Sequence, residues 1–98
     1  MTVYVIAQVK FIREEYYRRY QARFAEAFRP FKGRLLVADE KPKVLDGEWI
    51  GDKVVMEFPD ESEAMRFLDS PGYQEISKDR IAGAETLSLL VKGFPSPI

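Results

Sequence analysis

The order in which strand-like and helix-like hydrophobic spacing alternate is the feature that most constrains the fold of this chain. Alternating apolar residues, typical of strands, predict strands at Val3–Phe11, Arg34–Ala38, Lys53–Phe58 and Ala84–Lys92. Apolar residues at helical spacing lie between the first and second strands and between the third and fourth. This order, strand, helix, strand, strand, helix, strand, is that of the ferredoxin-like βαββαβ fold. We therefore expect an α+β domain whose helices cover one face of a four-stranded antiparallel sheet.

The predicted helices have recognisable start and stop signals. The first runs from Arg13 to about Phe28 and ends before Pro30, because the residue before a proline avoids the α region. The second starts at Asp60, which makes a variant of the capping box with Glu63. A serine and a proline at positions 70 and 71 are strong start signals, so we expect a separate third helix that runs to about residue 82.

Length and charge limit the number of domains and the kinds of binding partner that we expect for this chain. Its 98 residues are expected to form one domain, residues 1–98, with a tail at 93–98 that lies outside the sheet. A formal net charge of −1 gives no electrostatic case for binding nucleic acid or an anionic membrane. The N-terminus enters a strand pattern directly instead of a signal peptide, so a cytoplasmic location is expected.

The sequence contains no cysteine and no histidine. Without cysteine there is no disulfide, no thiolate metal site and no thiol nucleophile. Without histidine the usual general base, the usual haem ligand and most transition-metal sites are missing. No spacing of carboxylates argues for an all-oxygen magnesium or calcium site. We therefore expect no metal site and no cofactor.

The strands are apolar on both faces, and this pattern predicts self-association. By alternation, Tyr4, Ile6, Leu36 and Val55 fall on the face that the helices leave uncovered. An exposed apolar patch of that size is uncommon in soluble monomers. Pairing two sheets face to face across a two-fold axis hides it, so a homodimer is expected.

A set of short motifs runs over nearly the whole chain. It comprises the start MTVYVIAQVKF with Tyr20 downstream, Gly33-Arg34, Asp46-Gly47-Glu48-Trp49, Val54-Val55-Met56-Glu57-Phe58-Pro59-Asp60, Ser70-Pro71-Gly72-Tyr73-Gln74, Arg80 and Val91-Lys92-Gly93. Each motif alone is weak, but the F-P-D segment combined with S-P-x-Y-Q and a later arginine is fairly specific. In this combination the chain resembles the Domain of Unknown Function 1330 family.

The resemblance implies a dimeric α+β barrel. That superfamily includes antibiotic-biosynthesis monooxygenases, muconolactone isomerases and stress-responsive barrel proteins. The family itself has no settled activity, so the resemblance implies none. The chain departs from the family pattern at Ile12-Arg13, where the family commonly has an aspartate, and at Lys32, where it often has a glycine. If that aspartate binds a ligand in relatives, the role does not carry over to this chain.

Glu57 is the first candidate for chemistry, because it is a carboxylate in an otherwise apolar strand. Alternation puts Glu57 on the same face as Lys53 and Val55, toward the interior of a dimeric barrel. Arg34 lies on the partner strand and can reach it, although the sequence leaves the register open. A partly buried carboxylate of this kind can act as a general base or bind a ligand. The structural alternative is an ion pair at the dimer interface.

A second group of candidates comes from the third helix and from the loop before the third strand. Tyr73 and Arg80 are separated by two helical turns, so they share a face, and Arg80 is suited to bind an anionic substrate. Alternatively, Tyr73 anchors the corner between the two helices and Arg80 pairs with a nearby acid. Trp49, in a polar loop, is expected to be either a lid or a contact with a partner. Tyr17 and Tyr20 are predicted to be core residues, because they belong to the apolar stripe of the first helix.

These candidates support two functional hypotheses. In the first, the protein is a cofactor-independent enzyme or binder of a small organic acid, which it holds in a cleft between sheet and helices. The residues expected to line that cleft are Arg34, Trp49, Tyr73 and Arg80, with Glu57 as the proton-transfer group. In the second, the protein is a non-catalytic interaction or regulatory module with a packed interior. A solvent-connected cavity that reaches Glu57 favours the first hypothesis, and a filled interior favours the second.

Overall fold

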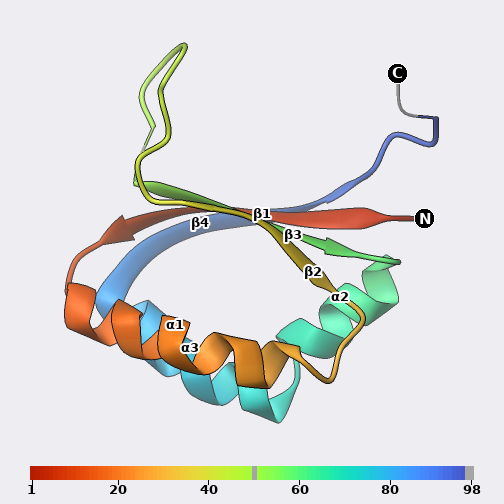
Figure 1. The fold of residues 1–98 in the computed structure, drawn as a ribbon, viewed down its shortest axis with the longest axis horizontal. Helices are drawn as coiled ribbons and strands as arrows, with labels where there is room; N and C mark the ends of the chain where they lie inside the picture. The colour runs from red at the N-terminus through yellow and green to blue at the C-terminus, as the bar shows by residue number, and fades with distance from the viewer. Residues whose placement is uncertain (50, 97–98) are drawn as a thin grey trace.

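The chain folds as a four-stranded antiparallel sheet with three helices, as the order of periodicities predicts (Figure 1). The computed structural model describes residues 1–49 and 51–96. Its elements are β1 (Val3–Phe11), α1 (Glu14–Phe28), β2 (Arg34–Asp39), β3 (Asp52–Phe58), α2 (Glu61–Leu68), α3 (Pro71–Gly83) and β4 (Ala84–Lys92). The strand order is β2-β3-β1-β4, and each neighbouring pair is antiparallel. The prediction of a ferredoxin-like α+β fold is confirmed.

All three helices lie on one side of the sheet, which leaves the opposite side uncovered (Figure 1). On the uncovered side, Leu87 and Leu89 of β4 are 57% and 56% exposed. Tyr4 and Ile6 of β1 lie on the same side and are only half-buried. We call this side the open face; it has the apolar character that alternation predicts. None of the helices in the described part of the chain is long and apolar enough to cross a membrane.

An aromatic cluster joins α2 to the sheet and to α1. Phe67 of α2 is fully buried, and its ring centroid lies 5.0 Å from that of Phe28, 5.8 Å from that of Phe58 and 4.5 Å from that of Tyr73. Large aromatic side chains contribute most to burial energy in a small core. This cluster closes one end of the space between the layers.

Both predicted caps of the second and third helices are present. The side chain of Asp60 accepts a hydrogen bond from the backbone N–H of Glu63, and that of Ser70 accepts one from the N–H of Tyr73. Such caps satisfy backbone donors that a helix start leaves free. Because α3 begins anew at Ser70, its first turn directs Tyr73 toward the core.

Among the described residues no side chain caps helix α1, and the chain just before the helix is held by the end of α3. The Gly83 carbonyl accepts hydrogen bonds from the backbone N–H groups of Ile12 at 2.8 Å and Arg13 at 2.9 Å. A side chain at position 83 has no room, since a Cβ there would lie 2.5 Å from the backbone nitrogen of Tyr17. This close approach fixes α1 against α3, so that the two helices present their inner faces to the same space.

The buried cluster predicts a clear difference between two positions on α2. Phe67→Leu should lower the free energy of unfolding by about 1–2 kcal/mol, because it removes aromatic contacts from a filled site. Met65→Leu, at a position that is 41% exposed, should change it by no more than about 0.5 kcal/mol. Urea denaturation followed by circular dichroism measures both. Equal effects at the two positions would contradict this account of the core.

Candidate functional site

A cavity of about 420 Å³ lies between the helix-facing side of the sheet and the helices α1 and α3. Its apolar wall is formed mainly by strand residues, namely Val5, Ala7, Val9, Leu35, Val54 and Met56. Its polar groups come chiefly from α1, α3 and β4. A volume of this size is within the range of natural small-molecule pockets, roughly 300–1,000 Å³. The interior is therefore not filled by the chain's own side chains.

The cavity exists because the helices cover the sheet unevenly. Helix α2 fills one end with Phe67, whereas every residue of the edge strand β2 remains exposed. On β4, the side chains that face the helices include Thr86 and Ser88, which are too small to fill the space opposite. Both residues line the cavity and add hydroxyl groups to its wall. The sequence of β4 thus helps to keep the space open.

Arg80 is a cation without a partner in the wall of this cavity. It forms no ion pair or side-chain hydrogen bond with any residue in 1–49 or 51–96, and its Nε atom is buried without a partner. The Oγ1 atom of Thr86, another lining residue, is likewise buried and unpartnered. A guanidinium group beside apolar walls is costly unless an anion or acceptor satisfies it. The structural alternative predicted for Arg80, pairing with a nearby acid, is not what the described residues show.

Three tyrosines from α1 and α3 line the same cavity. The hydroxyls of Tyr20 and Tyr73 are 3.0 Å apart and form a hydrogen bond, in which one donates and the other keeps a free proton. Burial raises the pKa of Tyr17 to about 12, with the negative charge of Asp52 adding to the effect. Burial also raises the pKa of Tyr20, with the neighbouring Tyr73 adding to it. Tyr17 and Tyr20 therefore stay protonated at neutral pH.

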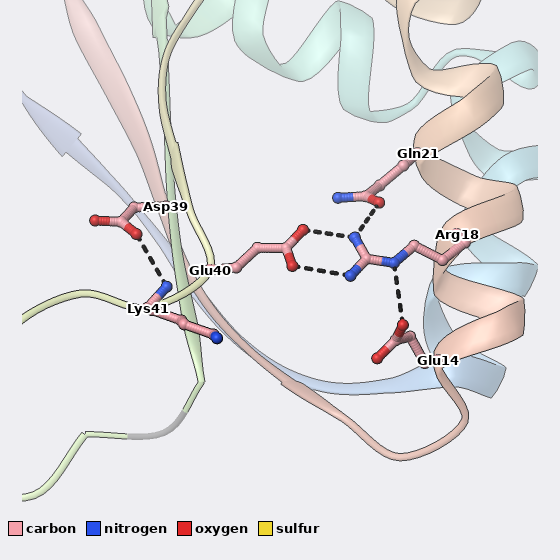
Figure 2. A network of polar contacts seen from close by, with 6 residues as sticks. All are labelled: Glu14, Arg18, Gln21, Asp39, Glu40 and Lys41. Carbon is pink, nitrogen blue, oxygen red and sulfur yellow. Dashed lines mark hydrogen bonds and ion pairs between the residues drawn. The ribbon is translucent and has the colours of Figure 1, made fainter.

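An ion pair bridges α1 and the end of β2 beside the cavity wall (Figure 2). The guanidinium of Arg18 donates to both carboxylate oxygens of Glu40, with Nη2 to Oε1 at 2.8 Å, and its Nη1 donates to Oε1 of Gln21 at 2.7 Å. Hydrogen bonding to Arg18 lowers the pKa of Glu40 to about 2. Gln21 is itself a lining residue. The bridge therefore connects the two layers at the edge where no helix covers the sheet.

Asp52, at the start of β3, is a buried carboxyl group near this edge. It is 6% exposed and makes no side-chain hydrogen bond with residues in the described ranges. Burial raises its pKa, and the negative charge of Glu40 adds to the rise, while Arg18 opposes it. The charged form of Asp52 is therefore held in the fold at a cost.

The structure does not bring the five predicted site residues together. Tyr73 and Arg80 line the cavity, whereas Arg34, Glu57 and Trp49 do not. Glu57 lies directly opposite Arg34 in the pairing of β2 with β3, and Arg34 Nη2 is 2.8 Å from Glu57 Oε1. The reason is strand alternation: Met56 faces the cavity, so Glu57 beside it must face the other side of the sheet. The structure thus has the ion pair of the structural alternative for Glu57, and its place at a dimer interface stays a prediction.

Trp49 belongs to the connection between β2 and β3, which extends from the sheet away from the helices (Figure 1). Its side chain is 50% exposed, and its Nε1 donates to the carbonyl of Asp46 at 2.9 Å. The Nζ of Lys53 lies 4.2 Å from the centre of its ring. Trp49 and Lys53 line a second hollow of about 320 Å³, together with Val44 and Leu45. Whether Trp49 is a lid or a partner contact stays a prediction.

Several cavity residues were not identified from sequence. Thr86 and Ser88 gave a usable signal, because they are polar on the side of the last strand where Ala84 and Leu90 continue the core. Hydroxyl groups on a core-facing side indicate either an internal hydrogen bond or a ligand. Gln21 gave no such signal, since a polar residue in a charged helix is ordinary. Tyr17 and Tyr20 are core residues as predicted, and they also form the cavity wall.

In the parts of the chain described by the structure, no three or more Asp or Glu side chains gather so that they could hold a metal ion. The cavity instead combines a guanidinium group, phenols and hydroxyls with apolar strand residues. Small-molecule pockets commonly combine an apolar lining with a few polar groups in this way.

The fold and the cavity together define a ferredoxin-like α+β protein with a small-molecule-sized space between its layers. The family described as "Domain of unknown function (DUF1330)" matches residues 2–94, and the chain belongs to this family. The resemblance inferred from the motifs is confirmed. No curated protein matches the chain.

Solved structures with the same fold are similar to this chain at low sequence identity. A protein of unknown function from Rhodopseudomonas palustris matches with a TM-score of 0.80 and 16% identity, over 97% of this chain and 84% of the other. SnoaB from Streptomyces nogalater, a cofactor-independent oxygenase, matches with a TM-score of 0.69 and 14% identity, over 97% and 95%. A dimeric protein of unknown function from Bacteroides fragilis matches with a TM-score of 0.58 and 14% identity, over 94% and 96%. These likenesses establish the ferredoxin-like fold.

The buried Asp52 predicts how stability depends on pH. The pKa of Asp52 in the folded chain is above the unfolded value of about 3.9. At pH values between these two pKa values, the folded state binds more protons than the unfolded state. Stability is therefore lost as pH rises through the folded pKa. Asp52→Asn should raise the melting temperature at pH 7 and reduce the loss that begins as pH rises above the unfolded pKa.

Thermal melts at a series of pH values measure this effect. Asp46→Asn, which changes an exposed aspartate in the connection between β2 and β3, is the matched control and should leave the pH dependence unaltered. A pH profile of Asp52→Asn that superimposes on that of the unsubstituted protein would show that Asp52 is not desolvated.

Proposed function

We propose that this protein binds a small organic acid in the cavity between sheet and helices, with the acid's carboxylate on Arg80. The observation that carries the proposal is the unpaired guanidinium group in the wall of a cavity of about 420 Å³. A carboxylate can accept two parallel hydrogen bonds from a guanidinium group and neutralises its charge. The apolar strand residues opposite supply a surface for the carbon skeleton of the ligand.

The lining residues also suit a cofactor-independent reaction of the bound acid. Phenols that remain protonated can donate hydrogen bonds to an oxygen that gains negative charge, which is how preorganised donors stabilise an enolate-like state. SnoaB, of the same fold, is a cofactor-independent oxygenase, but at 14% identity that likeness supports only the fold. The proposal therefore rests on the cavity. Glu57, across the sheet from it, takes the role of an ion-pair partner for Arg34.

The alternative hypothesis, an interaction module with a packed interior, has less support. A packed interior leaves no space between the layers, whereas this chain has a cavity there, with a cation in its wall that pairs with none of the described residues. The open face nevertheless supports self-association, and the two properties are compatible because they belong to opposite sides of the sheet.

The role of Arg80 can be tested with a panel of small aromatic and aliphatic carboxylic acids. Acids that bind should raise the melting temperature of the unsubstituted protein by several degrees at saturating concentration, since about 2.7 kcal/mol is gained at a hundredfold excess over Kd. Arg80→Gln should weaken binding by about tenfold or more, because a charged hydrogen-bonded pair is lost. Isothermal titration calorimetry gives the dissociation constants.

Lys78→Gln is the matched control, because it removes a charge of the same sign from the exposed side of α3, where Lys78 pairs with Glu75. It should leave binding unchanged. If no acid in the panel binds, or if Arg80→Gln and Lys78→Gln weaken binding equally, the proposed site is wrong.

We further propose that the protein is a homodimer that pairs two open faces. Leu87 and Leu89 lie on this face with more than half of their surface exposed, next to Ile6 on β1. The Arg34–Glu57 pair lies on the same face and would be enclosed by the contact. A structural neighbour from Bacteroides fragilis is described as dimeric, which is compatible with this assembly.

Light scattering coupled to size exclusion tests the assembly. The unsubstituted protein should have a mass of about twice the 11.4 kDa of one chain at micromolar concentration. Leu89→Arg should shift the mass toward one chain, because it places like charges in an apolar contact. Met65→Arg, on the exposed side of α2, should have no effect. A mass of one chain for the unsubstituted protein would overturn the dimer.

A further inference from the structure

We infer that the ligand is a hydroxylated aromatic acid, held at one end by Arg80 and at the other by the Tyr20–Tyr73 hydroxyl pair. This inference rests on the proposed function and specifies its substrate class. It follows from the spacing of unsatisfied polar groups along α3 and from the surface between them.

Two polar ends of the cavity are set apart by the geometry of one helix. Tyr73 and Arg80 both line the cavity, and seven residues of α-helix separate them by two turns, about 10 Å along the axis. Ser77 lies between them on the same face, but its hydroxyl already donates to the Tyr73 carbonyl at 2.7 Å. Ser77 therefore offers no free donor between the two ends.

Apolar side chains form most of the cavity lining beside this stretch, namely Val5 and Ala7 of β1, Val54 and Met56 of β3, and Phe24 of α1. The hydroxyl groups of Thr86 and Ser88 line the cavity on the β4 side. The apolar strand residues and the ring of Phe24 favour a ligand with a flat, rigid carbon skeleton. Such a skeleton loses little conformational entropy on binding. A short acid such as acetate reaches only one polar end, and a flexible aliphatic acid loses more entropy when it spans both.

The tyrosine pair requires a ligand oxygen that can accept a hydrogen bond. One proton of the pair is used in the hydrogen bond between Tyr20 and Tyr73, and neither hydroxyl has another partner in the described residues, 1–49 and 51–96. The remaining O–H is thus a donor without an acceptor. A ligand hydroxyl can accept from this donor and can also donate to an oxygen of the pair. A carboxylate at the other end occupies Arg80, so the ligand must carry both groups.

Two acids that differ only in one hydroxyl test this inference, namely 4-hydroxycinnamate and cinnamate. The unsubstituted protein should bind 4-hydroxycinnamate about fivefold to tenfold more tightly than cinnamate, the scale of one hydrogen bond. Tyr20→Phe/Tyr73→Phe, which removes both hydroxyls, should remove that preference while leaving the affinity for cinnamate within about twofold. Either single substitution leaves one hydroxyl that can donate to the ligand and should keep part of the preference, so the single variants test the pair if the double variant does not fold.

Tyr16→Phe is the matched control, because Tyr16 lies on α1 but is not a lining residue, and it should keep the full preference. Calorimetric dissociation constants for both acids with each variant complete the comparison. If both acids bind equally and Arg80→Gln weakens both, the hydroxyl site is overturned and the proposed carboxylate site stands. If neither acid binds but aliphatic acids do so through Arg80, the aromatic class is overturned while the carboxylate site again stands. If no acid of any kind binds, both are overturned.

Discussion

The alternation of side chains along the four strands is the constraint on which the rest of this structure depends. Successive residues of a strand point to opposite sides of the sheet, so each polar residue in a strand faces either the helices or the open face. Met56 faces the cavity, and Glu57 beside it faces away. The same rule gives β4 an apolar open face with Leu87 and Leu89 and a helix-facing side with Thr86 and Ser88. The cavity and the open face therefore lie on opposite sides of a single sheet.

The cavity is a consequence of incomplete cover in a small domain. Three helices cannot cover all four strands equally, and α2 packs tightly only at the end where Phe67 is buried. Elsewhere α1 and α3 are joined to each other through Gly83. The Arg18–Glu40 pair links α1 to the end of the edge strand β2 (Figure 2). The Nε atom of Arg80, buried without a partner in the described residues, reduces stability, since a buried donor without an acceptor is unfavourable. A ligand that supplies an anion would satisfy the guanidinium group of Arg80 and offset this cost.

The fold could be predicted almost completely from the sequence, and the candidate site only in part. The βαββαβ order and the caps at Asp60 and Ser70 are local signals, carried by residues close together in the chain. Tyr73 and Arg80 were also predictable as neighbours, since helical spacing alone places them on one face. Glu57 does not line the cavity with Tyr73 and Arg80. Alternation along β3 places Glu57 on the other side of the sheet, where it pairs with Arg34.

The sequence by itself determined which segments become strands and helices and which side of each strand is apolar, because these depend on the spacing of neighbouring residues. Only the tertiary structure decided that Arg80 has no acidic partner among the described residues, that Tyr20 contacts Tyr73, and that Arg34 lies opposite Glu57. These contacts join residues far apart in the chain. They depend on strand register and on how closely α1 and α3 approach the sheet, and side-chain packing of the whole domain sets both.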